Sequence, residues 1–265
     1  MKVTLTKLVH TLLADGKHFF TKAFAAQELG ISEAALGLQI MRLKSKGMIY
    51  SLRSGFYMII PAEYSHMGTL PPLWVIDPLM QHLGYNYYVS MLSSSSIYGA
   101  TQQQPQVFQV ICDGQVPEIK LSRGAIQFHY SKDLSKAKIE KLKTPTSYAS
   151  VASKEQTVLD LIKFYKACGY FSNIAAILKD LCPELNLDIL KQVLESDGRS
   201  SHLQRLGYIF EILEFENLAK IVEKILQNTR SRVFYRKLRP DLDGIEQARS
   251  KRWKLIINDQ IEIDE

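Results

Sequence analysis

Gln39, Arg42 and Lys46 are spaced three and four residues apart, so a helix through this segment presents their side chains on one face. Glutamine pairs bidentately with adenine, and arginine pairs bidentately with guanine, in the major groove of DNA. Lys44, on the same helix, is placed to touch phosphate. These residue types therefore predict a helix that enters the major groove and reads bases.

The segments around this helix predict a winged helix-turn-helix. Thr21 is suited to cap a first helix that ends before Gly30, and Ser32 is suited to cap the second helix. An apolar stripe at i, i+4 and i+7 spacing predicts which side of the second helix is buried: Leu36, Ile40 and Leu43. A short leading helix over Lys7–Ala14 is expected to complete the core with Leu8, Leu12 and Leu13.

The wing is expected after the second helix. Met48–Leu52 and Phe56–Ile60 are rich in aliphatic, β-branched and aromatic residues, which is typical of strands, and Arg53-Ser54-Gly55 suits the tight turn between them. Arg53 is expected to lie at the tip of the wing.

Charge supports this interpretation. The first 60 residues hold eight lysines and arginines against three acidic residues, so they carry +5 of the chain's formal net charge of +6. A basic excess on one small module is the expected footprint of phosphate binding. The alternative is a small helical subdomain with an ordinary solvated charged face that contacts another protein.

The whole chain has 265 residues, 46% of them hydrophobic and 23% charged, as expected of a folded protein with two domains. No apolar run approaches the roughly 20 residues that span a bilayer, and the N-terminus lacks a signal-peptide core, so we expect a cytoplasmic protein without membrane contact. The odd number of cysteines, widely spaced, predicts reduced and buried thiols: Cys112, Cys168 and Cys182.

The predicted fold class is α+β, with an N-terminal winged helix-turn-helix over residues 1–67 and a C-terminal domain over 68–265. Within the C-terminal domain, residues 68–150 are expected to be mixed α/β, 151–228 helical, and 229–265 a basic tail. Helices are predicted at Asp77–Leu83 and Tyr88–Tyr98, followed by three strands: Val107–Cys112, Glu118–Leu121 and Ala125–Tyr130. If the basic tail does not bind nucleic acid, Lys254–Ile257 is instead expected to form a terminal strand that covers a sheet edge.

The tail holds a second concentration of charge. Residues 220–254 contain 11 basic and four acidic side chains, with Phe234, Tyr235 and Trp253 among them. This pattern suits a second contact on bent DNA or an RNA surface, and the alternative is a solvated helical face followed by a strand. The candidate residues of this second nucleic-acid surface are Arg230, Arg232, Arg236, Lys237 and Arg239.

No catalytic motif is present. The six histidines are dispersed, and the chain has no metal-binding histidine pair, phosphate loop, glycine-rich dinucleotide turn or nucleophile elbow. Asp241-Leu242-Asp243-Gly244 is more simply a turn than a divalent-cation site. Ser93–Ser96 lacks a partner base and suits close helix packing. We therefore expect no catalytic residue, no cofactor and no metal.

Four ordered segments carry a family resemblance. In Ser32–Tyr64 the matching positions are Leu36, Leu43, Gly47, Ser54-Gly55, Tyr57, Pro61 and Tyr64. Tyr88–Gly99, Val151–Leu161 and Gln204–Tyr208 continue the match, which spans about Phe20–Leu213. Together they resemble the AbiEi family of type IV antitoxins and their transcriptional-regulator relatives.

The resemblance implies a winged helix that binds inverted repeats in double-stranded operator DNA upstream of its own operon, and a C-terminal domain required for antitoxicity. For the winged helix of this chain it implies groove contacts by Ser32, Gln39 and Arg42. The contacts to the DNA backbone that it implies are those of Lys22, Lys44, Lys46, Arg53 and Ser54. It also implies an abortive-infection system for phage defence, whose nucleotidyltransferase-like toxin forms no stable complex with the antitoxin. Tyr98 stands where many relatives have histidine, and the tail after Asn228 lies outside the match. The expected function is a non-enzymatic antitoxin and autorepressor; the alternative is an interaction module or an RNA-directed enzyme, of nuclease or nucleotidyltransferase type, that uses the winged helix for docking.

Overall fold

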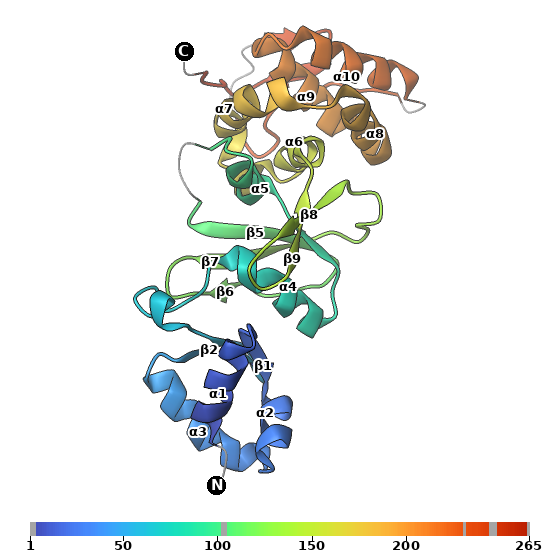
Figure 1. Cartoon of the computed structure of the whole chain (residues 1–265). Helices are drawn as coiled ribbons and strands as arrows, with labels where there is room; N and C mark the ends of the chain where they lie inside the picture. Colours follow the sequence, from blue (N-terminus) through green and yellow to red (C-terminus); the bar gives the residue numbers. More distant parts are fainter. Residues whose placement is uncertain (1–3, 102–104, 230–231, 244–247, 264–265) are drawn as a thin grey trace. The chain divides into compact units, whose positions relative to one another are not determined.

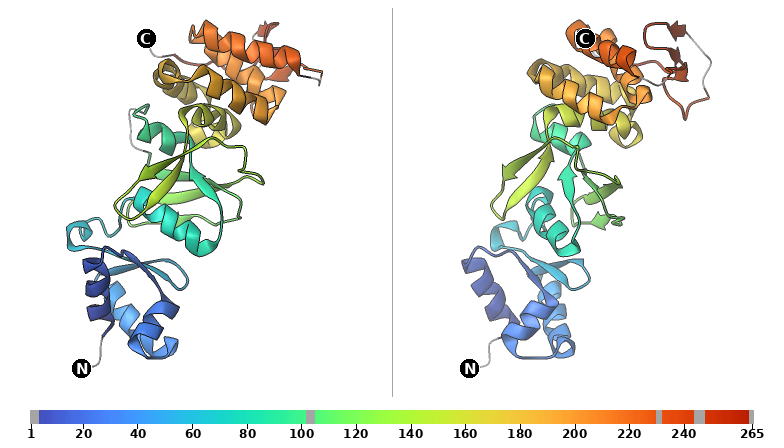
Figure 2. Two further views of the ribbon diagram at one scale, coloured as in Figure 1. Left: turned by 45° about the vertical axis from the view of Figure 1, so that its right-hand side comes forward. Right: turned by 90° about the vertical axis from the view of Figure 1, so that its right-hand side faces the viewer.

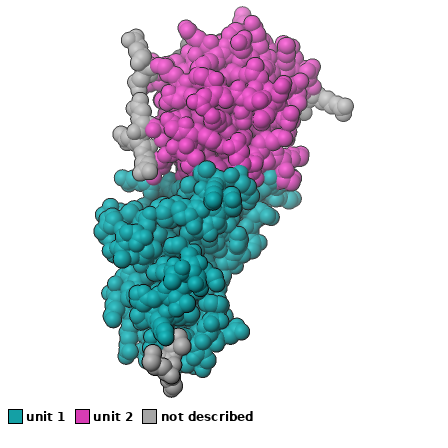
Figure 3. Space-filling model, viewed as in Figure 1, with its two compact units in different colours: residues 1–88, 106–134, 141–150 teal, residues 89–105, 135–140, 151–265 magenta. Residues whose placement is uncertain are grey.

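Figure 1 shows the chain in a computed structural model, which describes residues 4–101, 105–229, 232–243 and 248–263. These residues contain ten α-helices and three β-sheets, so the fold is mixed α and β. Contacts divide the chain into two compact units (Figure 3). Unit 1 comprises residues 1–88, 106–134 and 141–150, and unit 2 comprises residues 89–105, 135–140 and 151–265.

The elements of the first half, in chain order, are α1 (Leu5–Ala14), β1 (Phe19–Thr21), α2 (Lys22–Leu29), α3 (Glu33–Ser45), β2 (Ile49–Arg53), β3 (Phe56–Ile59), α4 (Pro72–Leu83), β4 (Tyr87–Val89), α5 (Met91–Ile97), β5 (Val107–Cys112), β6 (Ile119–Lys120) and β7 (Ala125–Tyr130). Those of the second half are β8 (Ile139–Lys143), β9 (Tyr148–Ala152), α6 (Lys154–Lys163), α7 (Tyr170–Leu181), α8 (Leu187–Asp197), α9 (Ser200–Ile212), α10 (Glu216–Asn228), β10 (Arg236–Lys237), β11 (Ala248–Ser250) and β12 (Leu255–Ile257). Among the described residues, no helix has the length and apolar character needed to cross a membrane.

The caps predicted for α2 and α3 are confirmed. Thr21 Oγ1 accepts a hydrogen bond from the Phe24 N–H at 3.1 Å, and Gly30 ends α2 in the left-handed conformation with φ 61°. Ser32 Oγ accepts from the Ala35 N–H at 3.2 Å, so the chain turns between the two helices within three residues. Local side-chain chemistry therefore sets the angle at which α3 leaves α2.

A small sheet of order β1-β3-β2 backs the three N-terminal helices (Figure 1). The hairpin of β2 and β3 closes through Arg53 opposite Phe56, with Gly55 at φ 77° in the turn, as predicted. β1, which the sequence analysis missed, pairs antiparallel with β3. The buried core of these elements is formed mainly by Leu5, Leu8, Val9, Leu12, Phe20, Leu36, Ile40, Leu43, Ile49, Tyr57 and Ile59. The stripe predicted for α3 is therefore confirmed.

Unit 1 extends beyond residue 67. Tyr50 Oη in β2 donates to the carbonyl oxygen of Lys120 in β6 at 2.8 Å, and the ring of Phe56 stacks on His82 in α4 with centroids 4.5 Å apart. These contacts join the N-terminal hairpin to α4 and β6. The structure thus divides the chain differently from the sequence, because α4 and β5–β7 group with the first 67 residues.

The predicted helix over Tyr88–Tyr98 is wrong in its first part. Tyr87–Val89 forms strand β4, and α5 begins only at Met91. Ser90 is extended, and Met91 has φ 57°, so the backbone changes direction between the two elements. A short apolar run such as Tyr-Tyr-Val does not by itself distinguish a buried strand from a helix.

A mixed six-stranded sheet has the order β6-β7-β5-β4-β9-β8. β5 and β7 run parallel with Val107 opposite Ala125, and both strands were predicted with the observed bounds. β6 pairs antiparallel with β7. β8 and β9 were not predicted; all five residues of β8 are exposed, so this strand lacks the alternating apolar pattern that identifies a half-buried strand.

Unit 2 contains the helical bundle α6–α10 (Figures 1 and 2). Each helix buries an apolar stripe, as the periodicity predicted. The alternative considered for the tail, a terminal strand at Lys254–Ile257 that covers a sheet edge, agrees with the structure in the strand but not in its place in the sheet. β12 is the centre of the three-stranded sheet β10-β12-β11, because β10 pairs parallel on one side and β11 pairs antiparallel on the other.

Candidate nucleic-acid interface

Arg42 and Lys44 are exposed in the last turn of α3, and Lys46 is exposed at its C-cap. The Arg42 guanidinium has no hydrogen-bond or ion-pair partner within the described part of the chain. Cations in the last helical turn also interact favourably with the negative end of the helix dipole, so they do not destabilise α3. Three predicted contact residues are therefore exposed together on one helix.

Ser32 and Gln39 have structural partners. Ser32 Oγ caps α3 through the Ala35 N–H, as described above. Gln39 is half-buried, and its Oε1 accepts a hydrogen bond of 2.9 Å from the Leu5 N–H at the start of α1. Each of these oxygens already accepts a hydrogen bond from a backbone N–H at the start of a helix. A contact to a base through the same oxygen would compete with that hydrogen bond. Groove contacts by these two residues stay a prediction.

Two of the predicted backbone contacts are also engaged within the protein. Lys22 Nζ lies 3.4 Å from Glu33 Oε2 at the start of α3. Arg53 Nη2 donates to the carbonyl oxygen of Pro117, and partial burial lowers the pKa of Arg53. Ser54, at the tip of the hairpin, is exposed. The hairpin arginine is thus anchored to the segment before β6, while the turn itself is open to solvent.

The outward side of α3 also exposes two long apolar side chains that the sequence analysis missed. Leu38 is 64% exposed and Met41 is 67% exposed. They lie on the side of the helix opposite Leu36, Ile40 and Leu43. The sequence could have predicted this exposure, because α3 has a second apolar stripe at helical spacing in addition to the stripe that is buried.

The tail residues predicted as a second surface fall into three groups. Arg230 lies outside the described residues. Lys237 and Arg239 form ion pairs, Lys237 with Asp243 at 3.0 Å and Arg239 with Asp259 at 3.3 Å. The remaining two, Arg232 and Arg236, are exposed. Fewer cations are therefore available to bind a polyanion here than the number of basic residues in the tail indicates.

Exposed aromatic rings accompany these arginines. Phe234 is 55% exposed with the Arg232 guanidinium 5.5 Å from its ring centroid, and Tyr235 is 44% exposed with Arg249 at 5.7 Å. Trp253, by contrast, is fully buried and cannot stack on a base. An aromatic ring in solvent beside a guanidinium is a composition found where proteins stack on single-stranded bases.

The positive charge of Arg252 is balanced by acidic side chains within unit 2. Its two terminal nitrogens donate to three carboxylates, Glu216 at 3.0 Å, Glu223 at 2.9 Å and Glu211 at 2.9 Å. These hydrogen bonds raise the pKa of Arg252, those from Glu216 and Glu223 most. A basic residue that joins α9 to α10 in this way contributes to the helical bundle and not to a nucleic-acid surface.

A buried polar network joins α5 to α6 in unit 2. The Asp160 carboxylate is fully buried, and it accepts hydrogen bonds from Ser90 Oγ at 2.9 Å and from Gln156 Nε2 at 3.1 Å. Thr157 Oγ1 donates to Ser94 Oγ at 2.9 Å beside it. Buried polar groups are stable when satisfied in this way, and small serines allow the two helices to approach closely. The serine run thus has a packing role, as the sequence analysis favoured.

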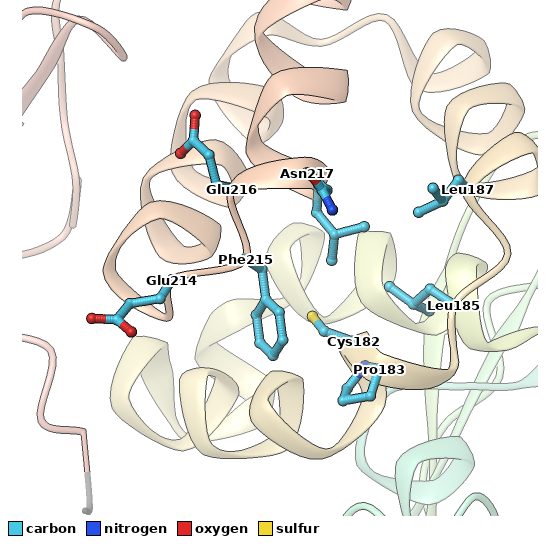
Figure 4. A pocket seen from close by; sticks show the side chains of 9 residues that line it. Cys182, Pro183, Leu185, Leu187, Glu214, Phe215, Glu216 and Asn217 are labelled. Atoms are coloured by element: carbon cyan, nitrogen blue, oxygen red, sulfur yellow. The ribbon is translucent and has the colours of Figure 1, made fainter.

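One pocket of about 400 Å³ lies in unit 2, beside the turn between α9 and α10 (Figure 4). Its lining is formed by Cys182, Pro183, Leu185, Leu187, Glu214, Phe215, Glu216, Asn217 and Leu218. Figure 4 shows the Glu214 carboxylate directed away from Phe215 and Cys182, and the Glu216 carboxylate binds Arg252. Burial raises the pKa of Cys182, which disfavours its thiolate. These groups do not converge on a common reacting point.

Within the described ranges, no group of three or more histidine, cysteine, aspartate or glutamate side chains could hold a metal ion. Asp241, considered as a possible ligand, instead accepts a hydrogen bond of 2.6 Å from Tyr165 Oη. That bond, together with nearby cations, lowers the pKa of Asp241. Burial, followed by the hydrogen bond and charge of Asp241, raises the pKa of Tyr165 to about 12.

Comparison with known proteins identifies the central part of the chain. Residues 88–212 match the family model of the AbiEi antitoxin C-terminal domain. These residues belong to the AbiEi antitoxin family. The match supports an antitoxin role in a toxin–antitoxin system, which implies a toxin partner. It also agrees with three of the four segments that carried the resemblance in the sequence.

The crystal structure of the RV2827C protein from Mycobacterium tuberculosis resembles almost the whole chain. The TM-score is 0.66 with 16% sequence identity, and the likeness covers 96% of this chain and 92% of that one. At this identity the likeness shows a shared mixed α/β fold and nothing further. No curated protein matches the chain in sequence.

The last motif of the AbiEi domain holds the C-terminal sheet. Gln204 Nε2 donates to the carbonyl oxygens of Trp253 at 2.9 Å and Lys254 at 3.0 Å. Arg205 is only 7% exposed, and its Nε donates to the Leu238 carbonyl at 2.7 Å; burial lowers its pKa. The residues of this motif therefore bind backbone of the tail, a segment that the sequence resemblance did not reach.

Tyr98 directly follows α5. Its Oη donates to the Ala152 carbonyl at 2.7 Å and approaches Glu140 Oε2 at 3.3 Å, and Lys154 Nζ lies 5.5 Å from the ring centroid. Burial and the Glu140 charge raise the pKa of Tyr98, so its hydroxyl stays protonated. The side chain acts as a fixed hydrogen-bond donor that ties the end of α5 to β9.

Proposed function

We propose that the chain is the antitoxin of a type IV, abortive-infection toxin–antitoxin system used in phage defence, and that it represses its own operon by binding operator DNA. The observation that carries the proposal is an AbiEi domain at residues 88–212 preceded by two capped helices, the second of which exposes three cations. Residues 1–67 then serve as the winged helix-turn-helix, residues 68–265 serve as the antitoxin domain, and the protein acts in the cytoplasm.

DNA binding would proceed by two kinds of contact. Lysines and arginines around α3 displace counterions from phosphate, and each such contact adds about 0.9 to the slope of log K against log salt. Arg42, which has no partner in the described structure, is the residue best able to donate two hydrogen bonds to a guanine edge. Inverted repeats bring two such helices to one operator, and occupancy of that operator blocks the promoter.

The tail supplies a second contact in this proposal. Arg232 and Arg236 are exposed beside Phe234 and Tyr235, so the surface offers both charge and stacking area to nucleic acid. Lys237 and Arg239 contribute less, because acidic side chains already pair with them. Arg232→Ala with Arg236→Ala is expected to reduce the salt slope of binding without changing the preferred sequence.

The toxin partner is proposed to be a nucleotidyltransferase-like enzyme that the antitoxin opposes without forming a stable complex and without catalysing a reaction. The AbiEi match supports the existence of a toxin partner. A mixture of purified toxin and full-length chain should elute as two separate species in size-exclusion chromatography. Co-elution at micromolar concentration would contradict this part of the proposal.

Salt-titrated binding of the full chain to its own upstream DNA and to scrambled DNA tests the DNA-binding proposal. Arg42→Ala is expected to lower affinity for the operator by roughly 10-fold while leaving scrambled DNA little changed, since a bidentate base contact contributes about 1–3 kcal/mol of discrimination. Lys44→Ala, the matched control two residues along, is expected to weaken both DNAs alike. Equal losses on both DNAs for both variants would refute the assignment of Arg42 to base recognition.

The alternative is an interaction module, or an RNA-directed enzyme, that uses the N-terminal helices for docking. The exposed apolar side chains of α3 are the observation that favours a docking surface. Nuclease and nucleotidyltransferase assays with Mg²⁺ distinguish the enzyme from the antitoxin. Cleavage or extension of RNA by the purified chain would favour that alternative, and salt-sensitive DNA binding without sequence preference would favour docking.

A further inference from the structure

The centre of the outward face of α3 is apolar. Leu38 and Met41, 64% and 67% exposed, follow Ala34 at helical spacing on the side opposite the buried stripe. In an isolated subdomain this arrangement is unfavourable, because both side chains leave apolar area in water. Their exposure on the same helix as Arg42 and Lys46 indicates a surface that another molecule covers.

Hydrogen-bonding groups are scarce at this centre. Gln39 Oε1, the predicted reader of adenine, already accepts the Leu5 N–H. Arg42, an exposed donor with a long side chain, lies one helical turn beyond Leu38. A helix with this face in the major groove presents mainly methyl, methylene and thioether groups to the base edges. The one apolar group that base edges offer there is the C5-methyl group of thymine.

Charge favours DNA as the occupant of this face. Arg42, Lys44 and Lys46 are exposed around the apolar centre, and the first 60 residues carry a net charge of +5. A second copy of this chain would bring the same cations against one another, which disfavours a protein–protein contact through this face. A polyanion with apolar groups in its groove satisfies both the cations and the apolar centre.

Building on the DNA-binding function proposed above, we infer that Leu38 and Met41 recognise the C5-methyl groups of thymines in each half of the operator. Specificity then comes from shape and apolar contact at these positions, with Arg42 adding a hydrogen-bonded base beside them. The predicted operator accordingly places thymines at the centre of each major-groove contact, next to a guanine.

Deoxyuridine tests this inference directly, because it differs from thymidine only by the missing methyl group. The full chain is titrated onto its upstream DNA and onto the same duplex with every operator thymidine replaced by deoxyuridine. Each lost methyl contact is expected to reduce affinity about fourfold, so contacts in two half-sites should reduce it at least about tenfold. The double variant Leu38→Ala/Met41→Ala should bind both duplexes with equal affinity.

The matched control is Leu187→Ala, which shortens a similarly exposed leucine, 48% exposed, on α8 in the other unit. It should keep the full preference for thymidine. Circular dichroism spectra of all variants should coincide, since the substituted side chains are exposed.

The negative results of these experiments distinguish between the proposed DNA-binding function and this inference. Absence of binding to either duplex by the wild-type chain overturns the proposed DNA-binding function itself. Binding without any effect of deoxyuridine leaves that function standing and overturns this inference, and so does a thymidine preference that persists in the double variant. If the double variant changes the oligomeric state measured by light scattering while leaving DNA binding unchanged, the face is a contact between copies and the inference is overturned.

Discussion

Replacing Gly207 by alanine would place a methyl group inside the indole of Trp253. A Cβ built on Gly207 lies 2.1 Å from Cζ3 and 2.5 Å from Cε3 and Cη2 of that ring. Trp253 is fully buried, and its Nε1 donates to Glu211 Oε2 at 2.8 Å. The ring cannot accommodate the methyl group by a small rotation, so it must shift and lose this hydrogen bond.

Three contributions determine the expected change in the free energy of unfolding. Overpacking of a well-packed core costs about 1–3 kcal/mol. Loss of the Nε1 hydrogen bond costs about 1 kcal/mol, and alanine in a helix is more favourable than glycine by about 1 kcal/mol. Gly207→Ala should therefore lower the free energy of unfolding by about 2 kcal/mol, and it should loosen the C-terminal sheet that Trp253 anchors to α9.

Urea unfolding followed by circular dichroism and tryptophan fluorescence measures this change. Gly37→Ala is the matched control, because Gly37 is also within a helix and its added Cβ would meet no atom within 4 Å. It should be neutral or stabilising by up to about 1 kcal/mol. In a Trp253→Phe background, where the clashing ring atoms are removed, Gly207→Ala should cost much less. Equal stability of Gly207→Ala and wild type would refute the packing described for Trp253.

The remaining predictions concern stability, pH and thiol reactivity. Gln39→Ala should lower the free energy of unfolding by about 1 kcal/mol, because it leaves the Leu5 N–H without its acceptor; an unchanged urea midpoint would contradict this role. Burial raises the pKa of Asp197, but the hydrogen bond and charge of His202 with nearby cations outweigh it and hold that pKa below its usual range. The stabilisation from the ionised Asp197 carboxylate should thus be complete above its unfolded-state pKa of about 3.9 and be lost as pH falls through its lower native-state pKa. The free energies of unfolding of wild type and Asp197→Asn should therefore converge toward pH 2, and a constant difference would contradict this prediction. Burial raises the pKa of all three free thiols, so a disulfide reagent at pH 8 should modify them only after unfolding, and rapid modification of the native chain would show that they are accessible.

Local chemistry made the N-terminal helices predictable. Thr21, Gly30 and Ser32 each act on backbone groups within a few residues, so their types and spacing were sufficient to place the ends of α2 and α3. The buried stripe of α3 follows from helical periodicity in the same way. β4 was missed because three apolar residues carry no period, and its conformation depends on neighbouring strands.

Distant partners made the interface less predictable. Gln39 bonds to a residue 34 positions away, the hairpin Arg53 to one 64 positions away, and Trp253 to one 42 positions away. Residue type indicated that each side chain could meet nucleic acid, but only the fold shows that a backbone group or a carboxylate already meets it. Arg252 shows why a count of basic residues does not by itself predict a binding surface, since the count cannot show that three glutamates surround its side chain.

We expect this one chain both to oppose a toxin and to repress its own promoter, and we expect the second activity to depend on α3. Growth and promoter activity can be measured together in cells that express the toxin gene of the same operon and a reporter under the operon's promoter. The wild-type chain should restore growth and silence the reporter, whereas Arg42→Ala/Lys44→Ala should restore growth and leave the reporter active. A wild-type chain that fails to restore growth or fails to lower reporter expression, or a variant that still silences the reporter, would contradict the account.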